Sequence, residues 1–240
     1  MTRIVAFTML VTIWNLGAAQ DGSVGEVAEN ITAAPPDFNG VWLAAPGTIA
    51  SPTESVEMVG PEAPQLTAEG LRIREEYDLF VDDPGYLCNP SSINRVWSNP
   101  VPIEIEQHAD RVILRYEYMD AVRTVYLDGR SQPADMSPEI LGHSGGRYEG
   151  SALVIESTGF IFGYIGTVSG TPQTETLRTT ERLTLSENGQ RFRLDIFHED
   201  PATFTIPWIS TRDFARRTDL ERLDWDCVLE DAGYEEFRDP

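Results

Sequence analysis

The chain contains no lysine: all 18 basic residues are arginine, against 39 acidic residues, and the formal net charge is −21. The absence of lysine excludes Schiff-base catalysis and a lysine general base. The acidic excess repels nucleic acid and anionic lipid, so we predict no nucleic-acid partner. A well-solvated surface is the simplest use of this charge.

Long apolar runs are also missing, except at the N-terminus. Arg3 precedes an apolar run from Ile4 to Leu16, and small residues follow up to Ala19, which is the layout of a secretory signal peptide. The run is too short to cross about 30 Å of hydrocarbon. A membrane anchor is the alternative. We predict a signal peptide over residues 1–19, a periplasmic or secreted protein, and no stable membrane insertion.

Cysteine occurs only twice, as Cys88 and Cys227. Two cysteines in an exported chain most often pair, because the compartment is oxidising. A reactive thiol or a metal ligand is the alternative, but neither cysteine has a neighbouring Cys or His at ligand spacing. We therefore predict a disulfide between Cys88 and Cys227.

Histidine is nearly as scarce, with only His108, His143 and His198 in the chain. A metal site made from all three would require them to converge from three distant segments. We predict no metal site and no cofactor.

The remaining pattern is that of a β protein. Residues 20–36 are small and polar and predict a flexible leader, and residues 37–240 predict one domain. Apolar and polar residues alternate in most of this domain, and Asn188-Gly189 is typical of a tight hairpin turn. Thr67 predicts the start of one helix. The pattern indicates an all-β, antiparallel barrel with one or two short helices and about nine strands, at residues 38–43, 103–108, 111–117, 122–127, 153–156, 175–185, 192–198, 205–214 and 222–228.

Gly142 to Gly150 is the most informative segment. Gly142-His143-Ser144-Gly145-Gly146 matches the nucleophile elbow of serine hydrolases, but that motif requires a strand that turns into a helix. Here a β pattern follows instead. We predict a tight glycine-rich loop that forms one wall of a pocket, with His143 pointing into it. The alternative is a structural crossover in which His143 bonds to backbone.

Glu175 and Glu181 lie six residues apart on one predicted strand and so share a face. If that face points inward, their burial would raise the carboxyl pKa values, as acid–base catalysis requires. If it points outward, they form a polar stripe. Polar residues on both faces of this strand favour an interior that holds water or a ligand.

Two stretches resemble known families. Gly40-Val41-Trp42 resembles the Gly-x-Trp start of lipocalin-like, or calycin-type, barrels, in which the Trp closes one barrel end. Residues 142–160, GHSGGRYEGSALVIESTGF, resemble a block of uncharacterised bacterial exported proteins, approximately GHSxGxWEGDxLVVxTxGF. Further blocks of that family match Asp37–Trp42, Cys88, Asp110–Glu117, Val125–Arg130, Thr174–Arg182 and Cys227.

This resemblance covers nearly all of the chain after the leader and implies export and a β domain. It implies no activity. Two positions depart from the family block, because Tyr148 replaces a Trp and Ser151 replaces an Asp.

Two functions follow from these observations. One is a cofactor-independent acid–base enzyme, a lyase, isomerase or cyclase, that acts on a small apolar or aromatic molecule inside the barrel. The other is a non-catalytic exported protein that binds such a molecule. The predicted catalytic residues are His143, Glu175 and Glu181, and the predicted substrate-binding residues are Arg147, Tyr148, Arg178 and Trp42.

Overall fold

The computed structural model describes residues 34–45, 63–129 and 136–228. Its helices are α1 (Ala68–Glu76), α2 (Leu79–Asp82) and α3 (Ile93–Ser98), with 3-10 turns η1 (Pro84–Leu87) and η2 (Tyr118–Asp120). Its strands are β1 (Gly40–Ala44), β2 (Ile103–Gln107), β3 (Arg111–Tyr116), β4 (Val122–Tyr126), β5 (His143–Glu149), β6 (Ala152–Thr158), β7 (Gly163–Gly166), β8 (Thr171–Gln173), β9 (Arg178–Leu185), β10 (Arg191–Glu199) and β11 (Trp208–Arg217). The predicted signal peptide and most of the predicted leader lie outside the described residues.

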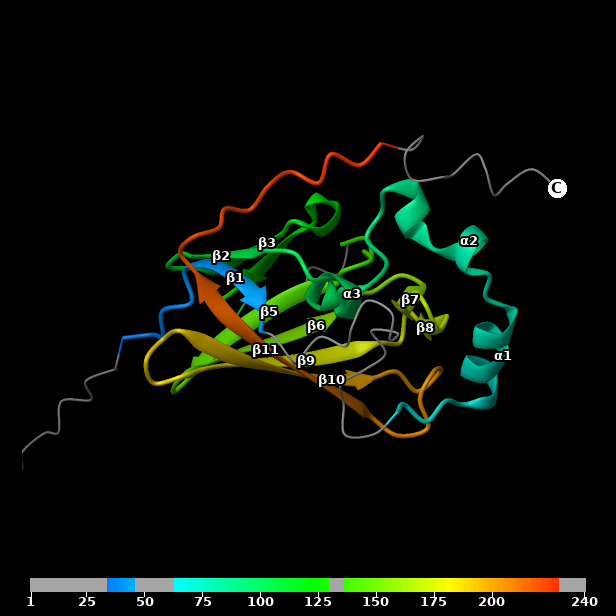
Figure 1. Ribbon diagram of the computed structural model, residues 1–240. Helices are drawn as coiled ribbons and strands as arrows, with labels where there is room; N and C mark the ends of the chain where they lie inside the picture. The colour runs from blue at the N-terminus through cyan, green and yellow to red at the C-terminus, as the bar shows by residue number, and fades with distance from the viewer. Residues whose placement is uncertain (1–33, 46–62, 130–135, 229–240) are drawn as a thin grey trace, which may run out of the picture. The chain divides into compact units, whose positions relative to one another are not determined.

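Nine strands close into a barrel in the order β1-β11-β10-β9-β6-β5-β4-β3-β2, and β1 pairs with β2 to complete it. Strands β7 and β8 form a separate two-stranded sheet (Figure 1). The predicted all-β barrel is confirmed. Two details differ: the described residues contain three α-helices instead of one or two, and β4 pairs with β5 in parallel.

The parallel pair follows from the length of the connection before β5. Sixteen residues separate Tyr126 from His143, and a parallel neighbour requires a crossover of roughly a dozen residues or more. Only two residue pairs join the strands, Val125 with Ser144 and Tyr126 with Gly145. The β4–β5 pairing is therefore the shortest in the barrel wall.

The glycine-rich segment predicted to be a loop is strand β5, so that prediction is wrong. The physical reason is visible at Gly146, where a Cβ atom would lie 2.6 Å from Val125 Cγ1 and 3.2 Å from the Val154 carbonyl oxygen. A side chain at this position would clash with both neighbouring strands. The glycine allows β5 to pack tightly between β4 and β6.

Local sequence signals predicted other elements correctly. The Thr67 side chain accepts a hydrogen bond from Gly70 N at the start of α1, and Ser186 to Arg191 form the β9–β10 turn around Asn188-Gly189. The strand predicted at 222–228 is absent, and these residues run as an extended segment without strand pairing. Cys88 and Cys227 form the predicted disulfide, which ties this segment to the end of η1.

The barrel interior is filled by large side chains. Trp42, Trp97, Phe192 and Phe214 are all fully buried, and Phe192 stacks on Phe214 with ring centroids 4.7 Å apart. Trp42 thus packs in the apolar interior, as predicted. Trp97 comes from α3 and contacts Tyr116, Phe192 and Phe214 edge to face. Helix α3 therefore inserts an aromatic side chain into the barrel.

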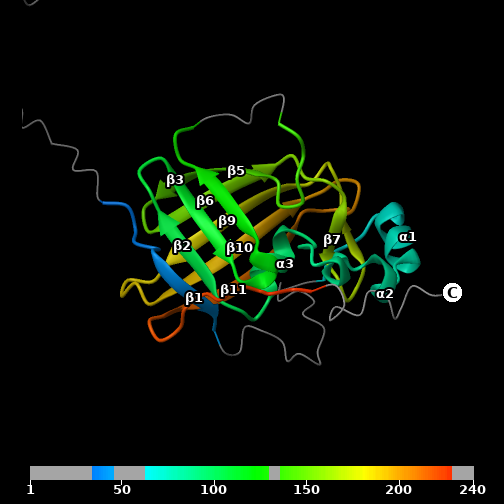
Figure 2. The ribbon, with the colours of Figure 1, turned by 90° about the horizontal axis from the view of Figure 1, so that it is seen from above.

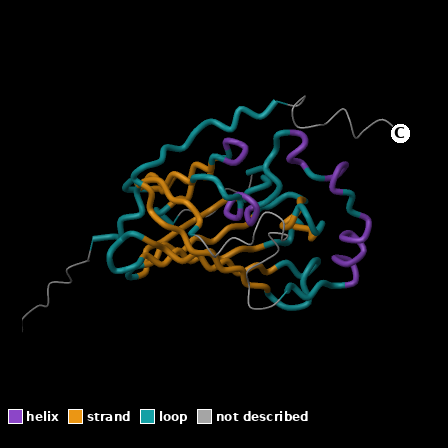
Figure 3. Tube along the Cα trace, viewed as in Figure 1, coloured by secondary structure: helices purple, strands orange, loops and turns teal. Residues whose placement is uncertain are grey.

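Helix α3 lies at one end of the barrel, between the barrel and the β7–β8 sheet, and α1 and α2 lie beyond that sheet (Figures 1 and 2). The tube in Figure 3 shows α1 and α2 on this side, clear of the barrel strands. Asn94 of α3 links both sheets, because its side chain accepts from Ser210 Oγ of β11 and donates to the Ile165 carbonyl of β7. The opposite end of the barrel contains Trp42.

Candidate functional site

A cleft of about 450 Å³ lies where β4 and the segment before β5 diverge. We call it the β4–β5 cleft. It is lined by Pro90, Met119, Ala121, Val122, Arg123, Thr124, Tyr126, Met136, Glu139, Ile140, Leu141, Gly142, His143 and Ser144. Its volume falls within the range of small-molecule sites, and its walls combine apolar side chains with a few polar groups.

A buried charge pair lies behind the cleft. Arg123 of β4 is 3% exposed and pairs with the fully buried Glu181 of β9, which also accepts a hydrogen bond from Trp97 Nε1. Arg123 Nη1 lies 3.0 Å from Glu181 Oε1, and Nη2 contacts Oε2. The carboxylate of Glu181 thus receives three N–H donors from two rigid elements.

Two serines complete this network. Arg123 Nε donates to Ser144 Oγ and Nη2 donates to Ser157 Oγ, both at 2.7 Å, and the two hydroxyl groups lie 3.0 Å apart. Because Ser144 also lines the cleft, the network connects the cleft to the barrel interior. The interaction spans β4, β5, β6 and β9 and adds side-chain bonds where the strand pairing is short.

Electrostatics keep Arg123 charged. Burial is the largest single effect and lowers the pKa of the Arg123 guanidinium, but the charge of Glu181, the nearby Tyr116 hydroxyl and the hydrogen bonds to Glu181 together raise that pKa. Burial also raises the pKa of the Tyr116 hydroxyl, which lies nearby. The two side chains thus form a salt bridge inside the barrel, held by matched hydrogen bonds.

His143 lines the cleft, on the opposite face of β5 from the buried Ser144. Its Nε2 donates to the Ser137 carbonyl oxygen at 2.8 Å. No described carboxylate forms a hydrogen bond or an ion pair with it. The histidine is therefore bonded to backbone at the cleft wall and is not part of an assembled proton-transfer pair.

The two predicted glutamates do not share a strand face. Asp200 accepts hydrogen bonds from the hydroxyl groups of Thr174 and Thr176, and it holds the chain in a turn before β9. Glu175 lies in this turn and is exposed, whereas Glu181 points into the barrel. The prediction that Glu175 and Glu181 lie on one face of a strand is therefore wrong, because Glu175 is exposed in a turn and Glu181 is buried in the barrel.

The predicted arginines lie on the outer surface. Arg147 forms ion pairs with Glu149 and Glu156 on the outside of β5 and β6. Arg178 is exposed at the start of β9. Neither lines the β4–β5 cleft.

Trp42 and Tyr148 lie toward the other barrel end. The Tyr148 hydroxyl accepts a hydrogen bond from Gln107 Nε2 at 2.6 Å, and Trp42 Nε1 donates to the Phe38 carbonyl oxygen. The guanidinium of Arg216 lies over the Trp42 ring, with 4.4 Å between Cζ and the ring centroid. Of the predicted site residues, His143 is thus the one that lines the cleft.

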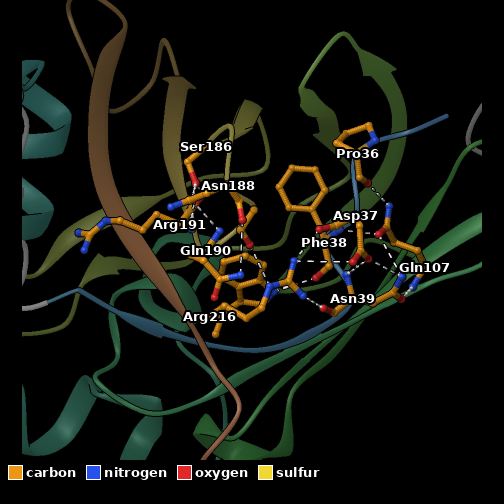
Figure 4. Close-up of polar contacts among 12 residues, drawn as sticks. Pro36, Asp37, Phe38, Asn39, Gln107, Ser186, Asn188, Gln190, Arg191 and Arg216 are labelled. Carbon is orange, nitrogen blue, oxygen red and sulfur yellow. Dashed lines mark hydrogen bonds and ion pairs between the residues drawn. The ribbon is translucent and has the colours of Figure 1, made fainter. Parts of the chain in front are cut away.

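The residues around Arg216 close this end (Figure 4). Arg216 Nη2 donates to the Asp37 carbonyl oxygen, Nη1 to the Asn39 carbonyl, and Nε to the Gly189 carbonyl at 2.9 Å. These bonds join the N-terminal segment to the β9–β10 turn. The arrangement is structural, because its donors are used by backbone oxygens.

The predicted site residues do not include four members of the buried network, namely Arg123, Ser144, Ser157 and Trp97. One signal was present: Arg123 shares a strand face with the apolar Val125. A charged residue on an apolar face requires a partner. The partner comes from β9, 58 residues later in the chain.

Among the described residues, no group of three or more His, Cys, Asp and Glu side chains is placed to hold a metal ion. Within the same residues, no helix is long and apolar enough to cross a membrane.

No family model and no curated protein sequence matches the chain. Solved structures do match, among them two point mutants of the fluorescent protein UnaG. Their sequences are 13% and 12% identical to this chain, the TM-scores are 0.33 and 0.35, and each match covers 76% of this chain and 97% of UnaG. The fold assignment rests on the strand order, since similarity at this level adds no support.

Proposed function

We propose that the chain is a single-domain exported protein that binds a small, largely apolar or aromatic molecule in the β4–β5 cleft without converting it. The observation that supports this proposal best is the cleft itself. It has apolar walls from Met119, Val122 and Leu141 and polar groups from Thr124 and His143. Such a mixture is suited to a ligand with an apolar body and few hydrogen-bonding groups.

The contacts of the two titratable candidates favour binding over catalysis. The Nε2 atom of His143 is used by the Ser137 carbonyl, and the carboxylate of Glu181 is used by Arg123 and Trp97. An acid–base mechanism requires a group that is within reach of the substrate and able to exchange a proton. Both groups are instead committed to structural contacts.

The substitution Thr124→Trp tests the cleft. Thr124 lies on the outer face of β4, so a tryptophan there fills the cleft without entering the core. We expect the affinity for the neutral apolar dye Nile red, measured by its fluorescence, to fall about tenfold or more, because the indole occupies space that the dye needs. A tenfold loss of affinity corresponds to about 1.4 kcal/mol of binding free energy.

Thr184→Trp is the matched control, because Thr184 lies on the outer face of β9 and outside the lining of the cleft. It is expected to bind the dye as the parent does. Equal affinity in the parent and Thr124→Trp proteins would refute the cleft as the binding site. Mass spectrometry of small molecules released from the purified protein would then identify a ligand with which to search for another site.

A second candidate function is the acid–base enzyme, and the position of His143 in the cleft wall favours it. If this function holds, His143→Ala reduces turnover of a small molecule that co-purifies with the protein about a hundredfold or more, the usual share of one acid or base group. His108→Ala is the control, because His108 is exposed in the β2–β3 turn. If the His143→Ala protein folds and is fully active, the hypothesis that His143 acts as an acid–base catalyst is rejected.

A further inference from the structure

A second buried polar cluster lies at the barrel end next to α3. Arg212 and Ser210 reach it from β11, His198 from β10, and Asn94 and Arg95 from α3. Ser210 Oγ donates to Asn94 Oδ1, which brings α3 against β11. This cluster shares no residue with the β4–β5 cleft.

Arg212 differs from the other buried arginine of the barrel. Arg123 is 3% exposed and pairs with Glu181, whereas Arg212 is 5% exposed and its side chain forms no ion pair with a described carboxylate. Its Nη1 atom is buried and has no hydrogen-bond partner among the residues that the structure describes. The charged group that acts on it is Arg95, which carries the same sign.

The lack of a counter-charge is not caused by a shortage of carboxylates, because the chain has 39 acidic residues and 18 arginines. Burial, and secondly the charge of Arg95, lower the pKa of Arg212 to about 10. The guanidinium therefore stays protonated at neutral pH. A buried cation without a counter-charge destabilises the folded state. A neutral side chain of similar size at position 212 would therefore make the protein more stable.

Other unpartnered polar atoms gather on the same side. Arg95 Nε, His198 Nε2 and Thr179 Oγ1 are buried without a hydrogen-bond partner in the described part of the chain. Thr179 and His198 lie directly opposite each other on β9 and β10, and both point inward. Arg212 contributes to the surroundings of His198, since its charge helps to lower the histidine pKa.

His198 adds neutral hydrogen-bonding capacity. Burial lowers its pKa to about 3, so the ring is neutral at pH 7. Nδ1 lies 3.3 Å from the Trp208 carbonyl oxygen and donates to it, which leaves Nε2 as an acceptor. The cluster thus offers guanidinium donors on one side and a neutral acceptor with a hydroxyl group on the other.

We propose that this cluster is a binding site for a small oxyanion, in which the guanidinium groups of Arg212 and Arg95 hold a carboxylate or phosphate group. Planar guanidinium donors match these groups, and a bound anion supplies the counter-charge that the described residues lack. Arg95 is partly exposed, so this end of the cluster is in contact with solvent. The site is independent of the function proposed for the β4–β5 cleft.

The experiment measures thermal unfolding of the full mature chain with sodium acetate, sodium phosphate or sodium chloride at equal ionic strength. Acetate or phosphate is expected to raise the parent Tm by about 2 °C or more over chloride, in a saturable manner. Arg212→Met is expected to unfold about 2 °C or more above the parent without an oxyanion and to lose the response. Arg191→Met is the control, because Arg191 is exposed on β10, and it is expected to respond as the parent does.

A response to acetate alone identifies an organic acid as the ligand class, and a response to phosphate alone identifies a phosphate. The proposal is overturned if neither anion acts on the parent, if Arg212→Met keeps the response, or if Arg212→Met folds but is less stable than the parent. If Arg212→Met does not fold, the variant Arg95→Gln tests the proposed anion site instead. Its apparent anion affinity is expected to fall about tenfold or more, and an unchanged affinity would reject the site.

Discussion

Replacing Arg123 with methionine is expected to lower the free energy of unfolding by about 3–5 kcal/mol. The substitution leaves Glu181 charged, fully buried and without its cationic partner, while Trp97 still donates to it. Ser144 and Ser157 keep their mutual contact but lose the guanidinium. The uncompensated carboxylate dominates the expected loss, which urea denaturation followed by circular dichroism measures.

The double variant Arg123→Met with Glu181→Gln separates the two causes. The glutamine removes the unpaired charge and still offers an oxygen to Trp97 Nε1, so most of the lost stability is expected to return. Arg193→Met is the surface control: Arg193 pairs with Asp213 on the exposed side of β10 and β11, and its loss is expected to cost less than about 1 kcal/mol. If Arg123→Met costs no more than this control, the buried pair does not stabilise the barrel wall.

The substitution Trp97→Ala is expected to destabilise the protein by about 3–5 kcal/mol. Trp97 fills the barrel end by contact with Tyr116, Phe192 and Phe214, and its deletion leaves a cavity in a packed core. The indole also donates to Glu181, so one bond to a buried carboxylate is lost as well. Urea denaturation measures the stability, and near-ultraviolet circular dichroism measures the aromatic packing.

Trp225→Ala provides the comparison for Trp97. Trp225 is partly buried and packs against Tyr118 outside the barrel. Its replacement is expected to cost much less, because part of the ring already contacts solvent. Equal effects at the two positions would show that α3 does not contribute a core residue.

Local chemistry made much of the fold predictable. The alternation in 103–117 predicted the β2–β3 hairpin, and Thr67 predicted the start of α1, because each signal acts between residues close in sequence. The Cys88–Cys227 disulfide was predictable because an exported chain is expected to meet oxidising conditions and this chain has only two cysteines.

The predicted strand number agrees with the barrel, but the set of strands differs. Residues 222–228 were predicted as a strand and are not one, and β5 was predicted as a loop. Glycines weaken an isolated strand, so their presence in β5 is explained only by the close approach of Val125 and Val154. Helix α3 was missed for a similar reason, since its Trp97 is stabilised by the barrel interior.

The sequence by itself determined the charge balance, the lack of lysine, the candidate cysteines and the β class, because these depend on residue types and local order. Tertiary structure alone decided which charged residues are buried and which have a partner. Arg123 and Arg212 are each an arginine on an inward strand face. Glu181 lies opposite the first, and no described carboxylate pairs with the second. Strand order and barrel closure set this difference, since they bring together residues far apart in the chain.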